Sequence, residues 1–171
     1  MKLTRLIPAA VAAAALLAGC SPTPSTALVV NGTTVTESQI DTYSRGCAQA
    51  LGIDQSQIVR KALVQTILIG EIMAPMLKEA GVTDEQVDAF AAKQGGQAAD
   101  LIKNDECKPF GRTNLRVAIV SQTLDKATWT KLLDKASVSI NPKYGRFDPE
   151  GTQSILTDSG SISIASEATL K

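Results

Sequence analysis

Three cysteines and the absence of histidine decide most of the chemistry that this sequence could carry. The cysteines are Cys20, Cys47 and Cys107, and their separations are far from the Cys-x-x-Cys spacing of redox pairs. Because the chain has no imidazole, a Ser-His or Cys-His nucleophile, a histidine-ligated metal and a histidine pH switch are excluded. We therefore expect the cysteines to serve anchoring or structure rather than catalysis.

Carboxylates are the other candidate catalytic groups, and they occur as two adjacent pairs. Asp84 with Glu85 fits a helix start, and Asp105 with Glu106 fits a loop. Neither pair has an apolar flank that would raise a carboxyl pKa for acid–base work. The Gly-Gly pair at 95–96 is not followed by the Lys-Ser/Thr of a phosphate-binding loop. The sequence predicts no catalytic residues, no cofactor and no metal, and hence a protein that is not an enzyme.

Charge and composition argue against a nucleic-acid partner. Basic and acidic residues each number 17 in the 171-residue chain, so there is no net charge and no basic stripe to collect phosphates. Aromatic residues make up only 4%, too few for a base-stacking platform. An apolar content of 44% is ordinary for a globular protein, and the length suits a single domain.

The N-terminus has the pattern of a secretory signal peptide. Lys2 and Arg5 precede an apolar run over residues 6–18 that ends in small residues. The run fits the apolar core of a signal peptide, roughly 7 to 15 residues, and is shorter than the roughly 18 residues of a membrane span. We expect residues 1–19 to be removed on export.

The residues Leu17-Ala18-Gly19-Cys20 resemble the lipobox of bacterial lipoproteins. The resemblance implies that Cys20 is acylated, with palmitate-type chains, and that its partner is membrane lipid on the extracytoplasmic face of the cell membrane. Residues 20–26 would form a tether that contains two prolines. The exported chain would have 152 residues, with 15 basic and 17 acidic side chains. An ordinary signal peptide followed by a chance cysteine is the alternative.

Export would leave Cys47 and Cys107 as a pair in a compartment where disulfides persist. We predict that they are bonded to each other. The bond would close a loop of about 60 residues and contribute on the order of 4 kcal/mol in the chain-entropy model. Two separate buried thiols are the alternative.

Helix signals account for most of the chain after residue 36. Thr36 and Thr83 each open a capping-box pattern, with Gln three positions later. Asp54 can cap the long central helix, and Pro75 should kink that helix or break it in two. The expected helices cover residues 37–51, about 55–80, about 84–94, 97–103, from 113 onward and 129–136, with a loop at 105–111 that holds Cys107.

Two short runs of apolar and β-branched residues, 27–30 and 138–140, lie at opposite ends of this helical region. A three-residue strand needs a partner, so we expect the two runs to pair. Asn31-Gly32 after the first run is the dipeptide that best tolerates a tight turn. The expected fold is mainly α, a compact multi-helix domain over 27–149 with a small two-stranded β pairing of its ends. A loosely ordered tail over 150–171 follows, in which 161–165 could add a weak strand.

The order of these segments resembles a known module. Residues 28–41, Leu-Val-Val-Asn-Gly-Thr-Thr-Val-Thr-Glu-Ser-Gln-Ile-Asp, are similar to the opening of the SurA N-terminal domain, shared with PrsA-like foldases and trigger-factor-like folds. Segments 62–65 and 78–88 resemble that family's long helix and the corner after it, and 138–141 its returning strand. The resemblance covers 27–142. It implies a chaperone that binds unfolded chains, without prolyl-isomerase activity, because the family's parvulin domain uses histidines and is missing here.

Such a chaperone would hold its clients in an apolar groove between helices. The groove candidates are Ile72, Met73 and Met76 on the central helix, although core filling is the ordinary role of methionine. We therefore expect a lipid-anchored, extracytoplasmic chaperone-like protein that binds unfolded or partly folded exported polypeptides. An envelope structural or accessory lipoprotein that binds one specific folded partner is the alternative. An open groove would favour the first, and a groove filled by the chain's own tail would favour a scaffold.

Overall fold

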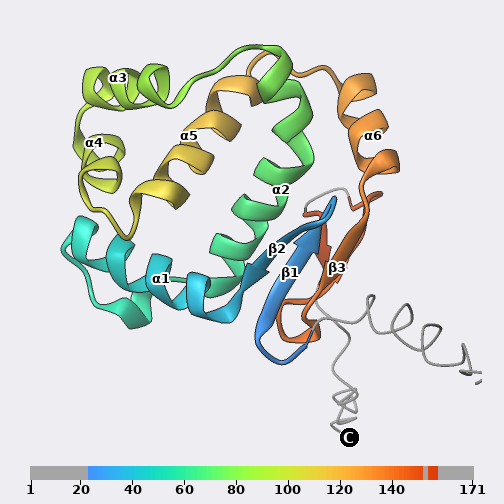
Figure 1. The fold of residues 1–171 in the computed structure, drawn as a ribbon, viewed down its shortest axis with the longest axis horizontal. Helices are drawn as coiled ribbons and strands as arrows, with labels where there is room; N and C mark the ends of the chain where they lie inside the picture. Colours follow the sequence, from blue (N-terminus) through green and yellow to red (C-terminus); the bar gives the residue numbers. More distant parts are fainter. Residues whose placement is uncertain (1–22, 152–153, 158–171) are drawn as a thin grey trace, which may run out of the picture.

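Six helices dominate the computed structural model, which describes residues 23–151 and 154–157. α2 packs mainly against α5, whereas α4 contacts α1, α3 and α5 (Figure 1). A small antiparallel sheet lies beside α2, so the expected mainly helical fold is confirmed. The helices are α1 (Glu37–Leu51), α2 (Arg60–Glu79), α3 (Asp84–Gln94), α4 (Gly96–Lys103), α5 (Lys108–Ser121) and α6 (Lys126–Lys135).

Local capping sets two of the helix starts as expected. The Thr36 hydroxyl accepts the backbone N–H of Gln39, whose side chain accepts the backbone N–H of Thr36. Thr83 and Gln86 repeat this reciprocal pair at the start of α3. Gly52 ends α1 with a φ of 64°, a left-handed conformation that costs glycine no Cβ clash. The predicted bounds of α1 and the predicted start of α3 are thereby confirmed.

α2 ends where the sequence predicts but begins later. Asp54 caps a short 3₁₀ helix, η1 (Gln55–Gln57), and α2 begins only at Arg60. The helix then continues past Pro75 to Glu79, so the chain does not break there. In the described part of the chain, no helix has the length and apolar character needed to cross a membrane.

α5 begins earlier than expected. The sequence predicts a loop over 105–111 and a helix from about 113, but α5 starts at Lys108, directly after Cys107. Pro109 lies in its first turn, where the missing N–H costs no hydrogen bond. The proline that indicated a loop therefore helps to start the helix, and Cys107 is fixed at a helix end.

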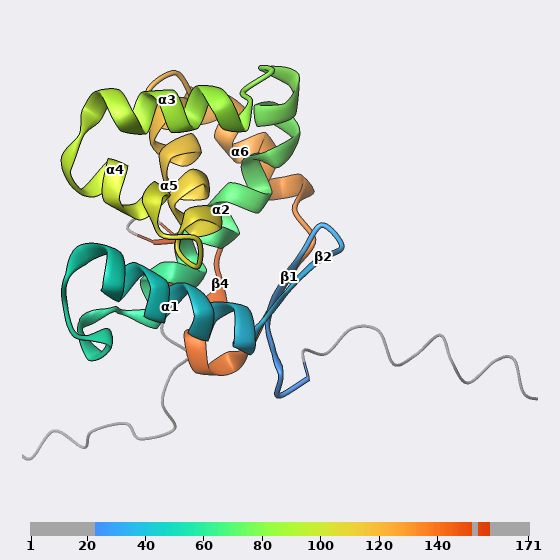
Figure 2. The same cartoon turned by 60° about the vertical axis from the view of Figure 1, so that its left-hand side comes forward.

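The two ends of the domain meet in a sheet with strand order β2-β1-β3. β1 (Thr26–Val30) turns through Asn31 and Gly32, with φ values of 50° and 86°, into β2 (Thr33–Thr36). Figure 2 shows this hairpin at one side of the helices. β1 also pairs antiparallel with β3 (Val138–Ile140), which confirms the predicted pairing of the chain ends. The sheet has three strands rather than two because β2 joins it.

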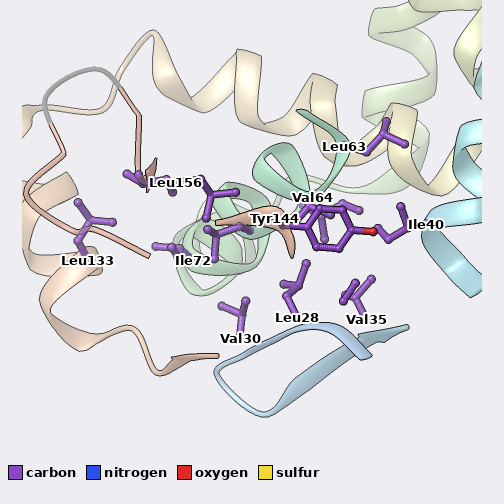
Figure 3. Close-up of a cluster of buried hydrophobic side chains, with 14 residues drawn as sticks. Leu28, Val30, Val35, Ile40, Leu63, Val64, Ile72, Leu133, Tyr144 and Leu156 are labelled. Atoms are coloured by element: carbon purple, nitrogen blue, oxygen red, sulfur yellow. The ribbon is translucent and has the colours of Figure 1, made fainter. Parts of the chain in front are cut away.

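The segment expected to be a loose tail contributes to the main core. β5 (Leu156–Thr157) pairs with β4 (Arg146–Phe147), and Ile155 and Leu156 are only 6% and 2% exposed. Leu156 belongs to the same apolar cluster as Ile72 of α2 (Figure 3). The packed domain therefore extends beyond the predicted boundary at 149. The predicted strand at 161–165 lies outside the described residues, as do the predicted signal peptide and Cys20.

A charged network joins the starts of α1 and α2 to η2 (Pro142–Tyr144). Glu37 Oε2 accepts hydrogen bonds from Lys143 Nζ at 2.6 Å, Tyr144 Oη at 2.8 Å and Arg60 Nη2 at 3.1 Å. Burial acts to raise the pKa of Glu37, but these three donors together lower it. The network holds the returning chain against the helix starts.

Candidate functional site

An open apolar groove lies between α2, α5 and α6. Its volume is about 420 Å³. Lys126, at the start of α6, is the only charged residue among those that line it, and Ser121 is the only other polar one. The lining residues are Ile69 and Met73 from α2, Val117 and Ser121 from α5, Leu124 between helices, and Lys126 and Trp129 from α6.

Helical periodicity places these side chains along one channel. Ile69 and Met73 are four residues apart on α2, and Val117 and Ser121 are four residues apart on α5, so each pair shares one face of its helix. The Asp125 carboxylate accepts the backbone N–H of Thr128 at 2.9 Å and caps α6. The cap fixes the helix turn that carries Trp129.

The three residues predicted to form a groove occupy different places. Ile72 is 1% exposed and lies in the main core with Leu156, so it is not a groove residue. Met73 is equally buried but lines the groove floor. Met76 is half-buried and packs in the same apolar cluster as Met73 without lining the groove. Only Met73 of the predicted set therefore faces this groove.

The sequence did not single out the other walls of the groove. Val117 lies in the helix expected from residue 113 onward, and Trp129 lies in the one expected over 129–136. Leu124 belongs to an apolar pattern that predicts only a helix. Nothing in their linear spacing relates them to α2. No residue of the described C-terminal segment, 154–157, lines the groove.

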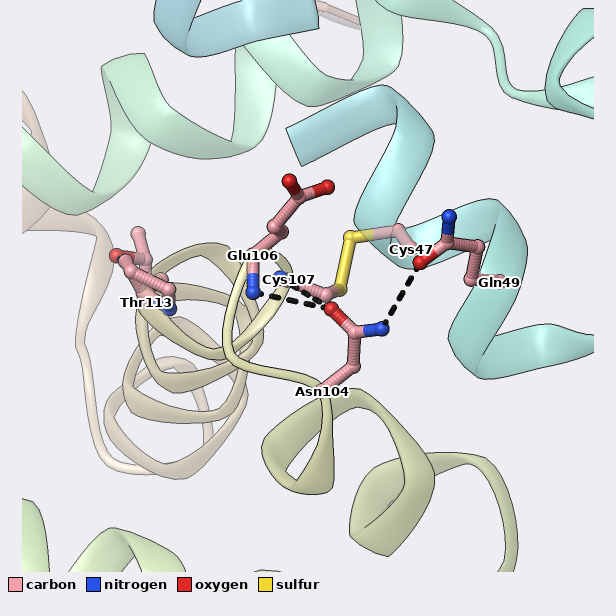
Figure 4. Close-up of a disulfide and its surroundings, with 7 residues drawn as sticks. Cys47, Gln49, Asn104, Glu106, Cys107 and Thr113 are labelled. Atoms are coloured by element: carbon pink, nitrogen blue, oxygen red, sulfur yellow. Dashed lines mark hydrogen bonds between the residues drawn. A yellow bond between two sulfur atoms is a disulfide. The ribbon is translucent and has the colours of Figure 1, made fainter. Parts of the chain in front are cut away.

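The predicted disulfide between Cys47 and Cys107 is present and buried. It joins α1 to the residue before α5, and its two cysteines are 1% and 0% exposed. The Asn104 side chain accepts the backbone N–H groups of Glu106 and Cys107 at 3.0 and 3.1 Å (Figure 4). A Cβ at Gly46 would lie 2.5 Å from the Glu106 Cβ, so only glycine permits this close approach. These contacts make the bond part of the packed interior.

An ionic cluster holds α3 against α5. Asp88 accepts from Arg112 Nε at 2.9 Å and Arg112 Nη2 at 2.7 Å, and Lys108 Nζ lies 3.4 Å from it. Asp84 also pairs with Arg112 and with Arg116. The hydrogen bonds from Arg112 hold the pKa of Asp88 down, at about 2. The acids at 84 and 88 thus act as structural anions.

Acid should destabilise the protein partly through Asp88. Because its folded-state pKa of about 2 lies below its ordinary value of 3.8, its contribution is complete above pH 4 and disappears as the pH falls toward 2. We expect the urea midpoint of Asp88→Asn to lie below that of the wild type at pH 6 and to approach it near pH 2. Asp134→Asn, a carboxylate outside any ion pair of the described chain, is the control. Equal differences at both pH values would contradict the assignment.

The apolar groove and the carboxylate cluster are the two candidate sites of the described chain. Residues 23–151 and 154–157 contain no group of three His, Cys, Asp or Glu side chains that could hold a metal ion. The carboxylate cluster at 84 and 88 is engaged by arginines. Comparisons with protein families, curated proteins and solved structures find no match for this chain. The assignment of a function therefore depends on the geometry of the surface and on the sequence.

Proposed function

We propose that the protein is a lipid-anchored, extracytoplasmic chaperone-like protein that binds unfolded or partly folded exported polypeptides. The observation that carries this proposal is the open apolar groove between α2, α5 and α6. Apolar surface left open between helices favours a partner that brings apolar side chains. The resemblance of residues 27–142 to the SurA N-terminal domain supports the same reading of the sequence.

The lining of the groove suits clients of varied sequence. Met73 supplies a flexible thioether, and Trp129 a large aromatic surface with one polar N–H. Neither group imposes a fixed hydrogen-bond pattern on a bound side chain. Selection would therefore depend on apolar area rather than on one sequence.

The anchor follows from the sequence at Cys20. An acylated Cys20 would lie six positions before the start of β1 at Thr26, a stretch that spans at most about 20 Å when extended. The folded domain would therefore stay close to the membrane surface. Clients would meet it as they leave the membrane, without a prolyl-isomerase step.

Suppression of client aggregation tests the function. The chain from Ser21 to Lys171 keeps every described core residue, and it should suppress aggregation of a reduced, unfolded client measured by light scattering. Ser121→Lys should lower this suppression at least twofold, because it places a second cation in the groove. The matched control is Thr130→Lys, an exposed α6 position that does not line the groove.

Two results would contradict the proposal. The first is an absence of suppression by the wild type at several-fold molar excess. The second is cross-linking in cells to one stoichiometric folded partner rather than to many transient clients. That second result would support the structural or accessory role instead.

A further inference from the structure

β2 is an edge strand whose backbone has unused hydrogen-bonding groups. In β1, bonding alternates between its two neighbours: Asn31 N–H donates to the Ser137 carbonyl, and the Ala27 carbonyl accepts from Asn141 N–H, both on the β3 side. Odd-numbered residues of β1 therefore bond toward β3, and even-numbered ones bond toward β2.

This alternation fixes the direction of each β2 residue. Thr33 and Val35 lie opposite the even-numbered Val30 and Leu28, so their backbone groups bond within the sheet. Thr34 lies opposite Val29 and turns its N–H and carbonyl away from β1. The residue is exposed, and none of the turn and loop hydrogen bonds of the described chain uses these two groups. Free edge groups of this kind are a template for another strand.

A pocket of about 330 Å³ opens along the same edge. Thr33, Thr34 and Val35 all line it. Because consecutive strand residues point to opposite faces of a sheet, a pocket that touches all three is reached from the strand edge. β1 covers the other edge, so the pocket lies along the free one.

The far wall of this pocket is apolar and aromatic. Tyr43 of α1, Ile67 of α2 and Phe110 of α5 line it. All three belong to the main core cluster or pack against it, which holds them in place. A strand added to β2 would direct alternate side chains toward this wall.

One acid at the rim of the pocket is available to a partner. Arg112 and Arg116 also line the pocket, but both are paired with Asp84. Glu71 lines it too and forms no ion pair among the described residues. Burial raises the pKa of Tyr43, and the charge of Glu71 adds to that rise, which places the carboxylate beside the aromatic wall. Glu71 therefore places at the rim a carboxylate that a basic side chain of a partner can pair with.

We propose that an extended polypeptide segment adds to the free edge of β2 as a fourth strand. It would exchange two hydrogen bonds with Thr34 and place an apolar side chain against Tyr43, Ile67 and Phe110. A basic side chain two positions away lies on the same face and pairs with Glu71. The inference rests on the proposed function, because it describes how one segment of an unfolded client is held.

Backbone substitution at Thr34 tests the strand addition. The probe is a fluorescein-labelled eight-residue peptide of β-branched residues with a central Phe and a Lys two positions later, and its Kd is measured by fluorescence anisotropy. Thr34→Pro removes the outward N–H but no bond to β1, a placement that edge strands tolerate. It should weaken binding about tenfold. The control Thr34→Val keeps the N–H and should bind as the wild type does; equal loss in both variants overturns strand addition.

Charge reversal at Glu71 tests the same site without touching the sheet. Glu71→Lys should weaken the Lys peptide about threefold and strengthen a peptide with Glu in place of that Lys by a similar factor. An unchanged preference overturns the assigned partner. This variant remains informative if Thr34→Pro fails to fold.

A third arm identifies the occupant. A chain ending at Thr157 should bind the peptide as the full one does; affinity raised tenfold would make residues 158–171 the occupant and overturn the inference. If the Thr34→Pro and Glu71→Lys variants bind the peptide as the wild type does, while the wild type still suppresses aggregation, only the inference is overturned. If the wild type does not suppress aggregation, the proposed function is overturned. The anisotropy measurement still tests whether the peptide adds to β2.

Discussion

Joint replacement of Cys47 and Cys107 by Ala should lower the free energy of unfolding by about 4 kcal/mol. The bond closes a loop with a sequence separation of 60, and without it the unfolded chain gains the entropy of that loop. Most of the loss should therefore come from the unfolded state. For a domain whose total stability is about 5 to 15 kcal/mol, this is a large share.

Urea unfolding followed by circular dichroism measures the effect. Each single Ala variant should lose nearly as much stability as the double variant, because either one opens the loop. Wild-type protein under reducing conditions serves as the control and should approach the double variant. Mass spectrometry of alkylated, unreduced protein should find neither thiol labelled, and labelling of both would refute the bond.

Leu156→Ala should lower the free energy of unfolding by about 3 kcal/mol. Leu156 is 2% exposed and lies in the main core with Ile72 and Leu133 (Figure 3). Truncation removes buried methyl groups and leaves a cavity that the surrounding helix and strands fill only in part. If the segment after residue 149 were a loose tail, the substitution would change almost nothing.

The neighbouring residue supplies a matched control. Thr157→Ala alters the other residue of β5, which is exposed, and should change the free energy of unfolding by less than about 0.5 kcal/mol. Chemical denaturation of both variants gives the comparison. Equal small effects would show that the C-terminal segment adds no stability.

Elements set by neighbouring residues could be predicted from the sequence. The reciprocal bonds of Thr36 with Gln39 depend on a three-residue spacing, and they give α1 its predicted start. Asn31 and Gly32 specify the hairpin turn through their own φ values. Signals of this kind act over a few residues, so they hold whatever the rest of the chain does.

The local errors arose where one residue type fits two structures. Proline is compatible both with a loop and with the first turn of a helix. At Pro109, the packing of α5 against α2 and α4 stabilises the helix. Ile155 and Leu156 stand in a Gly- and Ser-rich segment whose composition predicts looseness. Pairing of β5 with β4 and burial in the core override that composition.

The sequence by itself predicted the pairing of Cys47 with Cys107, on the hypothesis that Cys20 is acylated, and it determined the helix starts that short-range caps control. The tertiary structure decided which face of α2 is core and which is open. Ile72 and Met73 are adjacent in sequence, yet a helix turns about 100° per residue, so one joins Leu156 in the core and the other lines the groove with Trp129. The positions at which α5 and α6 cross α2 decide which face of α2 is buried in the core and which lines the groove. Those crossings depend on side chains far apart in the chain.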